Sequence, residues 1–193
     1  MKRLLIISIL INLVACDFFS TRSPEDPETG RSNFSTPDSP DIVLSNLQSS
    51  FTNKNIVNFL RCFQDANFES VLEFTPSQSA LVNNAFFFDN WELKNEEIIM
   101  NNLFNSLDPN AIPFLSFINI EQQQNPLKSI VQADYYILVN HGKDFEKEYT
   151  GTVQFNIISE TNDYWYISKW IDFNSSSSTI TESWSNLKFN FGR

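Results

Sequence analysis

The sequence has little of what metal, cofactor and nucleotide sites are usually built from: one histidine, two cysteines and four glycines in 193 residues. So few histidines and cysteines cannot form the ligand cluster of a zinc site. The sequence also contains no glycine-rich phosphate loop and no nucleophile elbow of the Gly-x-Ser-x-Gly type. We therefore expect no metal, no cofactor and no hydrolase of the elbow type.

Cysteine is too scarce for a disulfide framework as well. If Cys16 carries a lipid, as its context below indicates, Cys62 has no partner within the chain. Cys62 lies in the stretch NIVNFLRCFQD, whose apolar spacing predicts a helix. We expect it to pack there as a small apolar residue, and a reactive thiol is the alternative.

Positively charged residues are also few: the sequence has 13 Lys and Arg against 23 Asp and Glu, so its net charge is -10. An acidic body is a poor partner for nucleic acid and for anionic lipid head groups. We therefore expect no nucleic acid partner, and we expect any contact with a bilayer to be made through an attached lipid.

The apolar run at the start, Leu4–Leu13, is too short to span a membrane, which takes about 20 residues. It follows the positively charged Lys2 and Arg3 and ends in small residues. A positive start, a short apolar core and small residues at the end are typical of a secretory signal peptide.

The end of this segment, LVAC at residues 13–16, resembles a bacterial lipobox. The resemblance implies that the Cys16 thiol is attached to diacylglycerol, that the signal is cleaved between Ala15 and Cys16, and that the new amino terminus is acylated. Two or three acyl chains, at roughly 0.8 kcal/mol per buried methylene, form a stable anchor. We therefore expect a lipoprotein of the bacterial cell envelope, on the inner or outer membrane, facing the periplasm or the exterior. The alternative is an ordinary signal peptide with an incidental cysteine.

Composition divides the chain into three parts. Residues 1–15 are the predicted signal peptide. Residues 16–38 are rich in Ser, Thr, Pro and charge without any period, which is typical of a flexible tether. Residues 39–193 are enough for one folded domain of ordinary size.

The periodicity of this domain predicts helices first and strands afterwards. Apolar residues three and four apart indicate two helices between Ser39 and about Asp65 and a third from Trp91 or Asn95 to Leu107. The stretch NFESVLEFTPS alternates, which predicts a strand before the third helix. Everything after the third helix is strand-like, with four long strands in IPFLSFINIEQ, KSIVQADYYILVNHG, EKEYTGTVQFNIIS and DYWYISKWIDF. Helices followed by an antiparallel run predict an α+β fold with the helices on one face of the sheet.

This order resembles the nuclear transport factor 2-like superfamily, a cone-shaped fold shared with ketosteroid isomerases and polyketide cyclases. The resemblance covers residues 39–191 and rests on the paired opening helices, on NWELKNEEIIMNNLF and on the ending YWYISKWIDFNSSSSTITESWSNLKFNF. The spacing of Trp165, Trp170 and Asp172, with Trp184 after it, is similar to that in a bacterial lipoprotein branch of the superfamily. The resemblance implies three N-terminal helices on a strongly curved antiparallel sheet, with a cavity at the wide end of the cone.

Enzymes of that superfamily carry an acid–base pair in the cavity, Asp with Tyr or with His. Asp134 lies mid-strand with Tyr136 on the same side, so these two are the candidate base and donor if that side lines the cavity. A solvent-facing polar row is the alternative. His141 falls in a hairpin turn, where a general base does not come within about 3 Å of a substrate proton, and we expect it to be solvated. Asp172 is expected to cap a strand end.

Three functions stay open, because these patterns are of core residues and a fold does not give a function. The favoured one is a tethered, non-catalytic binding or assembly module, whose partner is a small hydrophobic ligand or an envelope protein. The second is an isomerase- or cyclase-type enzyme acting on a hydrophobic substrate through Asp134 and Tyr136. The third is a structural envelope protein whose cavity is filled by its own side chains, as 19 Phe residues would allow. A homodimer is compatible with each, and the state of the cavity separates them. Aromatic residues at these spacings, Trp165, Trp170 and Trp184 among them, are expected in the core.

Overall fold

The computed structural model describes residues 34–159, 163–176, 180 and 182–193. The predicted signal peptide, Cys16 and most of the predicted tether lie outside the described residues. Among the residues that are described, no helix is both long enough and apolar enough to span a membrane. In chain order the elements are α2 (Pro40–Thr52), α3 (Ile56–Arg61), β1 (Glu73–Thr75), α4 (Gln78–Asn84), η2 (Ala85–Phe88), α5 (Leu93–Ser106), β2 (Phe114–Asn125), β3 (Lys128–Leu138), β4 (Glu148–Ser159), β5 (Trp165–Asn174) and α6 (Trp184–Gly192).

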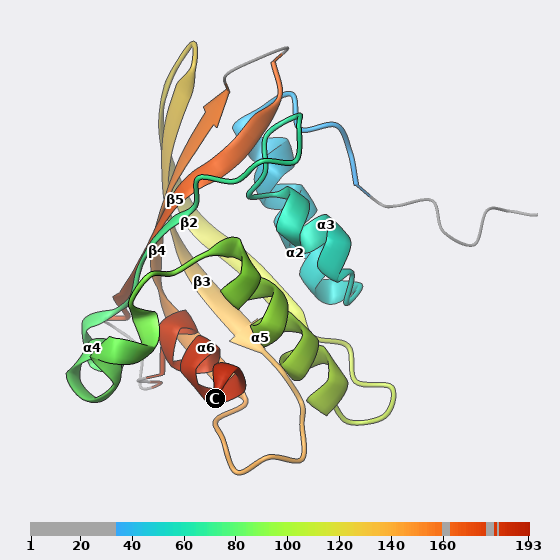
Figure 1. The fold of residues 1–193 in the computed structure, drawn as a ribbon, viewed down its shortest axis with the longest axis vertical. Helices are drawn as coiled ribbons and strands as arrows, with labels where there is room; N and C mark the ends of the chain where they lie inside the picture. Colours follow the sequence, from blue (N-terminus) through green and yellow to red (C-terminus); the bar gives the residue numbers. More distant parts are fainter. Residues whose placement is uncertain (1–33, 160–162, 177–179, 181) are drawn as a thin grey trace, which may run out of the picture. The chain divides into compact units, whose positions relative to one another are not determined.

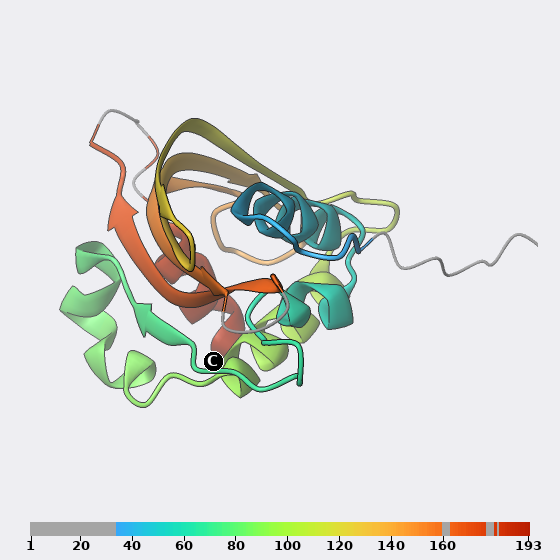
Figure 2. The ribbon, with the colours of Figure 1, turned by 90° about the horizontal axis from the view of Figure 1, so that it is seen from above.

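A five-stranded sheet in the order β1-β5-β4-β3-β2 forms one wall of the domain (Figure 1). Strands β2 to β5 are the four long strands predicted from the sequence, and each pairs antiparallel with the next one along the chain. Seen from above, the sheet curves around helix α2 (Figure 2). The predicted α+β class with a curved sheet is confirmed.

The first strand differs from its prediction in length and direction. β1 has three residues and pairs in parallel with β5, so the sheet is mixed and not wholly antiparallel. The chain turns just before it, because the Asp65 carboxylate accepts hydrogen bonds from the backbone N–H groups of Asn67 and Glu69. Phe68 in the same turn has a left-handed φ of 64°. Such side chain–backbone bonds compete with extended structure, and only the end of the predicted strand reaches the sheet.

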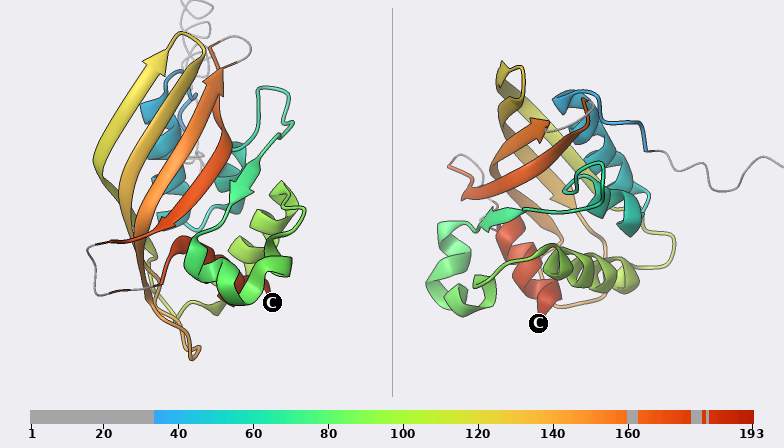
Figure 3. Two further views of the ribbon diagram at one scale, coloured as in Figure 1. Left: turned by 90° about the vertical axis from the view of Figure 1, so that its left-hand side faces the viewer. Right: turned by 45° about the horizontal axis from the view of Figure 1, so that its top comes forward.

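The three predicted helices are present as α2, α3 and α5. Pro40 opens α2 at a position where its missing N–H costs nothing, and the Asn55 side chain caps α3 by accepting from the backbone N–H of Asn58. Two further elements that the sequence analysis did not predict, α4 and η2, lie between β1 and α5. Helices α4, α5 and α6 group near one end of the strands (Figure 3).

Helix α6 is a correction, since the sequence analysis took everything after the third helix as strand-like. Its buried residues Trp184, Leu187, Lys188 and Phe191 follow the spacing of one helical face. The apolar residues of LKFNF alternate with polar ones, which is also the pattern of a strand. The start of the helix is fixed by Asn186, whose side-chain oxygen accepts from the backbone N–H of Ser183.

Side chains on the long strands alternate as predicted. The buried face of β3 carries Val131, Ala133, Tyr135 and Ile137, and that of β4 carries Tyr149, Val153, Phe155 and Ile157. The tryptophans Trp165, Trp170 and Trp184 are also buried, as expected for core residues.

The folded part begins earlier than the predicted boundary at residue 39. The side chain of Asn46 exchanges two hydrogen bonds with the backbone of Ser35. The backbone N–H of Trp165 donates to the carbonyl of Pro37 at 2.7 Å, and the Arg61 guanidinium lies 4.1 Å from the centre of the Phe34 ring. Residues 34–38 therefore pack on the domain and do not belong to a tether.

Candidate functional site

The inner side of the sheet, where the resemblance implies a cavity, is filled by aromatic side chains. Trp184 is fully buried there, and its ring centre lies 4.5 Å from that of Trp170 and 5.4 Å from that of Tyr135. Phe51 of α2 and Phe117 of β2 contact the same ring, each at 6.3 Å. Rings from α2, three strands and α6 thus pack against one another in this interior.

A buried Asp–Tyr pair lies in this interior, and it is not the pair predicted from the sequence. The Tyr135 hydroxyl donates to the Asp172 carboxylate at 2.7 Å and accepts from the backbone N–H of Trp184 at 2.7 Å. Asp172 also accepts from the backbone N–H and the hydroxyl of Ser185. Asp172 therefore does not cap a strand end, as we expected, but holds the first turn of α6, where a carboxylate also interacts favourably with the helix dipole.

Gly151 on β4 leaves the space that this pair requires. A Cβ atom at that position would lie 2.4 Å from the Tyr135 hydroxyl oxygen and 2.3 Å from the carbonyl oxygen of Phe173. Only glycine allows the Tyr135 side chain to reach across β4 to Asp172.

The surroundings of the pair shift both of its pKa values upward. Burial raises the pKa of the Asp172 carboxyl, although the hydrogen bonds from Ser185 and Tyr135 act in the opposite direction. Burial raises the pKa of Tyr135 well above its usual range, and the neighbouring Asp172 charge adds to this. A general base must reach a proton of its substrate, whereas both side chains make their hydrogen bonds with groups of the protein itself. The pair acts as an anchor for α6.

A buried ion pair anchors the middle of the same helix. The Lys188 ammonium contacts the Glu96 carboxylate of α5, and both side chains are fully buried. The ammonium also lies 3.4 Å from the centre of the Trp170 ring and 3.7 Å from that of Phe74, distances typical of cation–π contacts. Glu96 accepts a second hydrogen bond from the Trp91 indole at 2.9 Å. Burial lowers the pKa of Lys188 to about 8, while the Glu96 charge acts to raise it.

Cys62 lies in the core, as predicted. It is buried, and its thiol donates to the carbonyl of Asn58 at 3.4 Å. Burial raises the pKa of the Cys62 thiol, which lowers the fraction of reactive thiolate.

The predicted candidates Asp134 and Tyr136 lie on the outer face of the sheet, opposite to the filled interior. Asp134 accepts hydrogen bonds from the side chains of Asn119 and Thr152, both at 2.8 Å. The Tyr136 hydroxyl donates instead to Glu148 at 3.0 Å. The condition for this catalytic pair, that its side of the strand lines the cavity, is not met.

The prediction for His141 is also wrong, because this residue is fully buried and not solvated. Its ring packs 5.1 Å from the ring of Phe191 in α6. Ring atom Nδ1 accepts from the backbone N–H of Lys143 at 3.2 Å, so Nε2, 3.3 Å from the carbonyl of Glu146, is the donor. The β3–β4 loop folds back on α6, a long-range contact that the local turn composition does not reveal.

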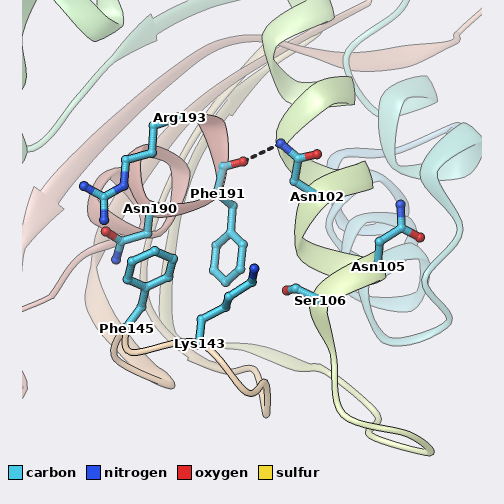
Figure 4. Close-up of a pocket in the computed structure, with 8 residues that line it drawn as sticks. All are labelled: Asn102, Asn105, Ser106, Lys143, Phe145, Asn190, Phe191 and Arg193. Atoms are coloured by element: carbon cyan, nitrogen blue, oxygen red, sulfur yellow. Dashed lines mark hydrogen bonds between the residues drawn. The ribbon is translucent and has the colours of Figure 1, made fainter.

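A cleft open to solvent lies between α5, the β3–β4 loop and the end of α6, with a volume of about 450 Å³ (Figure 4). The described residues that line it are Asn102, Asn105, Ser106, Lys143, Phe145, Asn190, Phe191 and Arg193. None of them is acidic. No group of three or more His, Cys, Asp and Glu side chains that could hold a metal occurs among the residues described in the structure.

Tyr135, Lys188 and the cleft were not predicted from the sequence. The helical spacing of Trp184, Lys188 and Phe191 was the available signal for α6, and Tyr135 follows from the same alternation that puts its neighbour on the outer face. The cleft joins segments about 40 residues apart or more, and no local pattern indicates it.

Comparison with solved structures identifies the fold. A candidate scytalone dehydratase from Novosphingobium aromaticivorans matches with a TM-score of 0.53 and 6% identity, over 74% of this chain and 88% of that one. A candidate calcium/calmodulin dependent protein kinase II association domain from Xanthomonas campestris has a TM-score of 0.51 and 7% identity, over 75% and 94%. A candidate dehydratase of the nuclear transport factor 2-like family from Streptomyces avermitilis has a TM-score of 0.50 and 8% sequence identity, over 71% of this chain and 94% of that one.

No protein-family model matches the sequence, and no curated protein matches it. At sequence identities this low, the matches show that the backbones are similar, but they do not show that the proteins share an activity. The structural matches agree with the resemblance found in the sequence, and the chain has the nuclear transport factor 2-like fold.

Proposed function

We propose that this protein is a lipid-anchored, non-catalytic module of the bacterial cell envelope that binds or assembles through its surface. One observation carries the non-catalytic part: the interior of the fold is occupied by Trp184 and its neighbours, and α6 is anchored there by Asp172 and by the Lys188–Glu96 pair. A small hydrophobic ligand inside the cone, one of the expected partners, has no support in this packing. The open cleft favours surface binding over a purely structural role.

The anchor rests on the sequence, and labelling tests it. In a bacterial host fed a palmitate analogue, the wild type is expected to incorporate label and to lose residues 1–15. Cys16→Ser is expected to stay unlabelled and uncleaved. Cys62→Ala is the matched control, because it removes the buried cysteine and should leave the label unchanged. Label retained by Cys16→Ser would contradict the anchor.

An isomerase- or cyclase-type enzyme is the second candidate function, because Asp172 and Tyr135 lie 2.7 Å apart inside the fold. The test is turnover of a model ketosteroid by purified wild-type protein, Tyr135→Phe and Tyr136→Phe. We expect no turnover by any of them. Turnover that Tyr135→Phe abolishes and Tyr136→Phe retains would overturn the non-catalytic proposal.

A further inference from the structure

We infer that the cleft between α5, the β3–β4 loop and α6 binds a hydroxylated carboxylic acid of the sugar-acid class. This inference rests on the proposed function as a surface-binding module and names the chemistry of its ligand. It follows from the charge of the cleft, from its hydrogen-bonding groups and from the rigidity of its walls.

The cleft gathers positive charge on an acidic protein. Lys143 and Arg193 line it in a chain whose net charge is -10. Elsewhere Lys94 and Lys169 each pair with a carboxylate at 2.6 and 2.7 Å. Within the described part of the chain, neither Lys143 nor Arg193 has such a partner, but the Arg193 guanidinium lies 5.0 Å from the centre of the Phe145 ring and 5.2 Å from that of Phe189. Lys143 is therefore the cation of the cleft without such a ring contact. The loop also carries Asp144, which does not line the cleft. A carboxylate is the ligand group that the Lys143 ammonium favours.

The helix ends argue against a ligand that is only an anion. α5 ends at Ser106 and α6 at Gly192, so both C-termini lie at the cleft. The last carbonyl groups of a helix lack intrahelical donors and carry partial negative charge. They reduce the attraction for a bare anion such as acetate, although the carbonyls of Leu103 and Phe191 already accept hydrogen bonds from Ser106 and Asn102.

The polar side chains of the cleft point to the same ligand chemistry. Three carboxamides, those of Asn102, Asn105 and Asn190, line it (Figure 4), and that of Asn190 also donates to the Tyr149 hydroxyl at 3.4 Å. Asn102 donates one N–H to the carbonyl of Phe191 at 2.7 Å, which fixes the orientation of its side chain. Each carboxamide offers both donors and acceptors, the combination that neighbouring hydroxyl groups of a sugar require.

The walls of the cleft are held in place by bonds outside it. The His141 ring accepts a hydrogen bond from the backbone N–H of Lys143 and packs on Phe191. His141 does not line the cleft itself, but it holds the β3–β4 loop in position against α6. The backbone N–H of Asp108 donates to Asn140 at 2.9 Å and ties the end of α5 to the same loop. A volume of about 450 Å³ lies within the range of small-molecule sites, roughly 300–1,000 Å³. A preformed site loses little entropy on binding.

The test is NMR titration of the full ¹⁵N-labelled protein in detergent micelles with glucuronate, glucose and acetate as probes. Glucuronate is expected to give saturable shifts at Lys143, Asn105 and Asn190, weakened by added salt. Glucose lacks the carboxylate and acetate lacks the hydroxyl groups, so each is expected to bind at least about tenfold more weakly than glucuronate.

Lys143→Gln is expected to weaken glucuronate binding by about tenfold. Lys147→Gln, in the same loop but outside the cleft, is the matched control and should bind as the wild type does. Absence of saturable shifts, equal binding of acetate, or equal loss in both variants would overturn the inference. None of these outcomes bears on the filled interior, so the proposed non-catalytic function would stand or fall by the ketosteroid assay.

Discussion

Tyr135 and Tyr136 are consecutive residues of β3, yet they belong to two different environments. Tyr135 is buried, and it bonds to Asp172 and to the backbone of Trp184. Tyr136 lies on the outer face and bonds to Glu148. Each face of the sheet has an Asp as well, Asp172 inside and Asp134 outside. The same side-chain chemistry is an internal anchor on one face and a surface hydrogen-bonding group on the other.

The difference lies in what happens when a partner is removed. A polar group in the interior has no water to replace a lost partner, so it bears the full desolvation penalty. A group on the outer face exchanges its partner for water at little cost. The interior groups should therefore dominate stability, and the outer groups should matter little.

The largest effect is expected at the buried ion pair. Lys188→Met leaves the Glu96 charge buried without its counter-ion, which should lower the free energy of unfolding by about 3–5 kcal/mol. Denaturant unfolding measures this loss. The double variant Lys188→Met with Glu96→Gln removes both charges and keeps an acceptor for Trp91, so it should recover most of the stability. A double variant no more stable than Lys188→Met would contradict this account.

The same lysine predicts a dependence on pH. The pKa of Lys188 is about 8 in the folded protein against 10.5 for an ordinary lysine, so between these values the unfolded chain binds more protons at this site. Stability therefore rises with pH across that window. The measurement is the difference in unfolding free energy between wild type and Lys188→Met from pH 7 to 10.5. A difference that shrinks as the pH rises would show the opposite sign.

A smaller effect distinguishes the two tyrosines directly. Tyr135→Phe leaves Asp172 and the backbone N–H of Trp184 each without one partner, and should cost about 1–3 kcal/mol. Tyr136→Phe removes the same atom from the outer face and should stay within about 0.5 kcal/mol of wild type. Equal losses in thermal and denaturant unfolding would remove the distinction between the faces.

The smallest effect is expected for Asp134→Asn. The side chain keeps an oxygen that can accept from Thr152, so unfolding free energy should change by less than about 1 kcal/mol. A larger loss, measured against Asp172→Asn as the interior counterpart, would mean that the outer face is more tightly structured than its contacts indicate.

The sequence predicted the elements whose information is local. The alternation of β3 and β4 and the spacing in α2 gave the right elements and the right buried residues. It did not decide which face of β3 lines the interior, so Asp134 was a candidate and Tyr135 was not. It could not show that Lys188, in an apolar run, finds a partner 92 residues earlier. The prediction for His141 was wrong for the same reason, because its ring is buried against Phe191, which is distant in the sequence.

The interior of this domain is completed by α6, which has a consequence for how the chain folds. The hydroxyl of Ser185 accepts from the backbone of Ser77, 108 residues earlier, and β1 pairs only with β5. Contacts between such distant residues slow folding, because a large loop must close before they form. The core therefore cannot close until residues 184–192 are available.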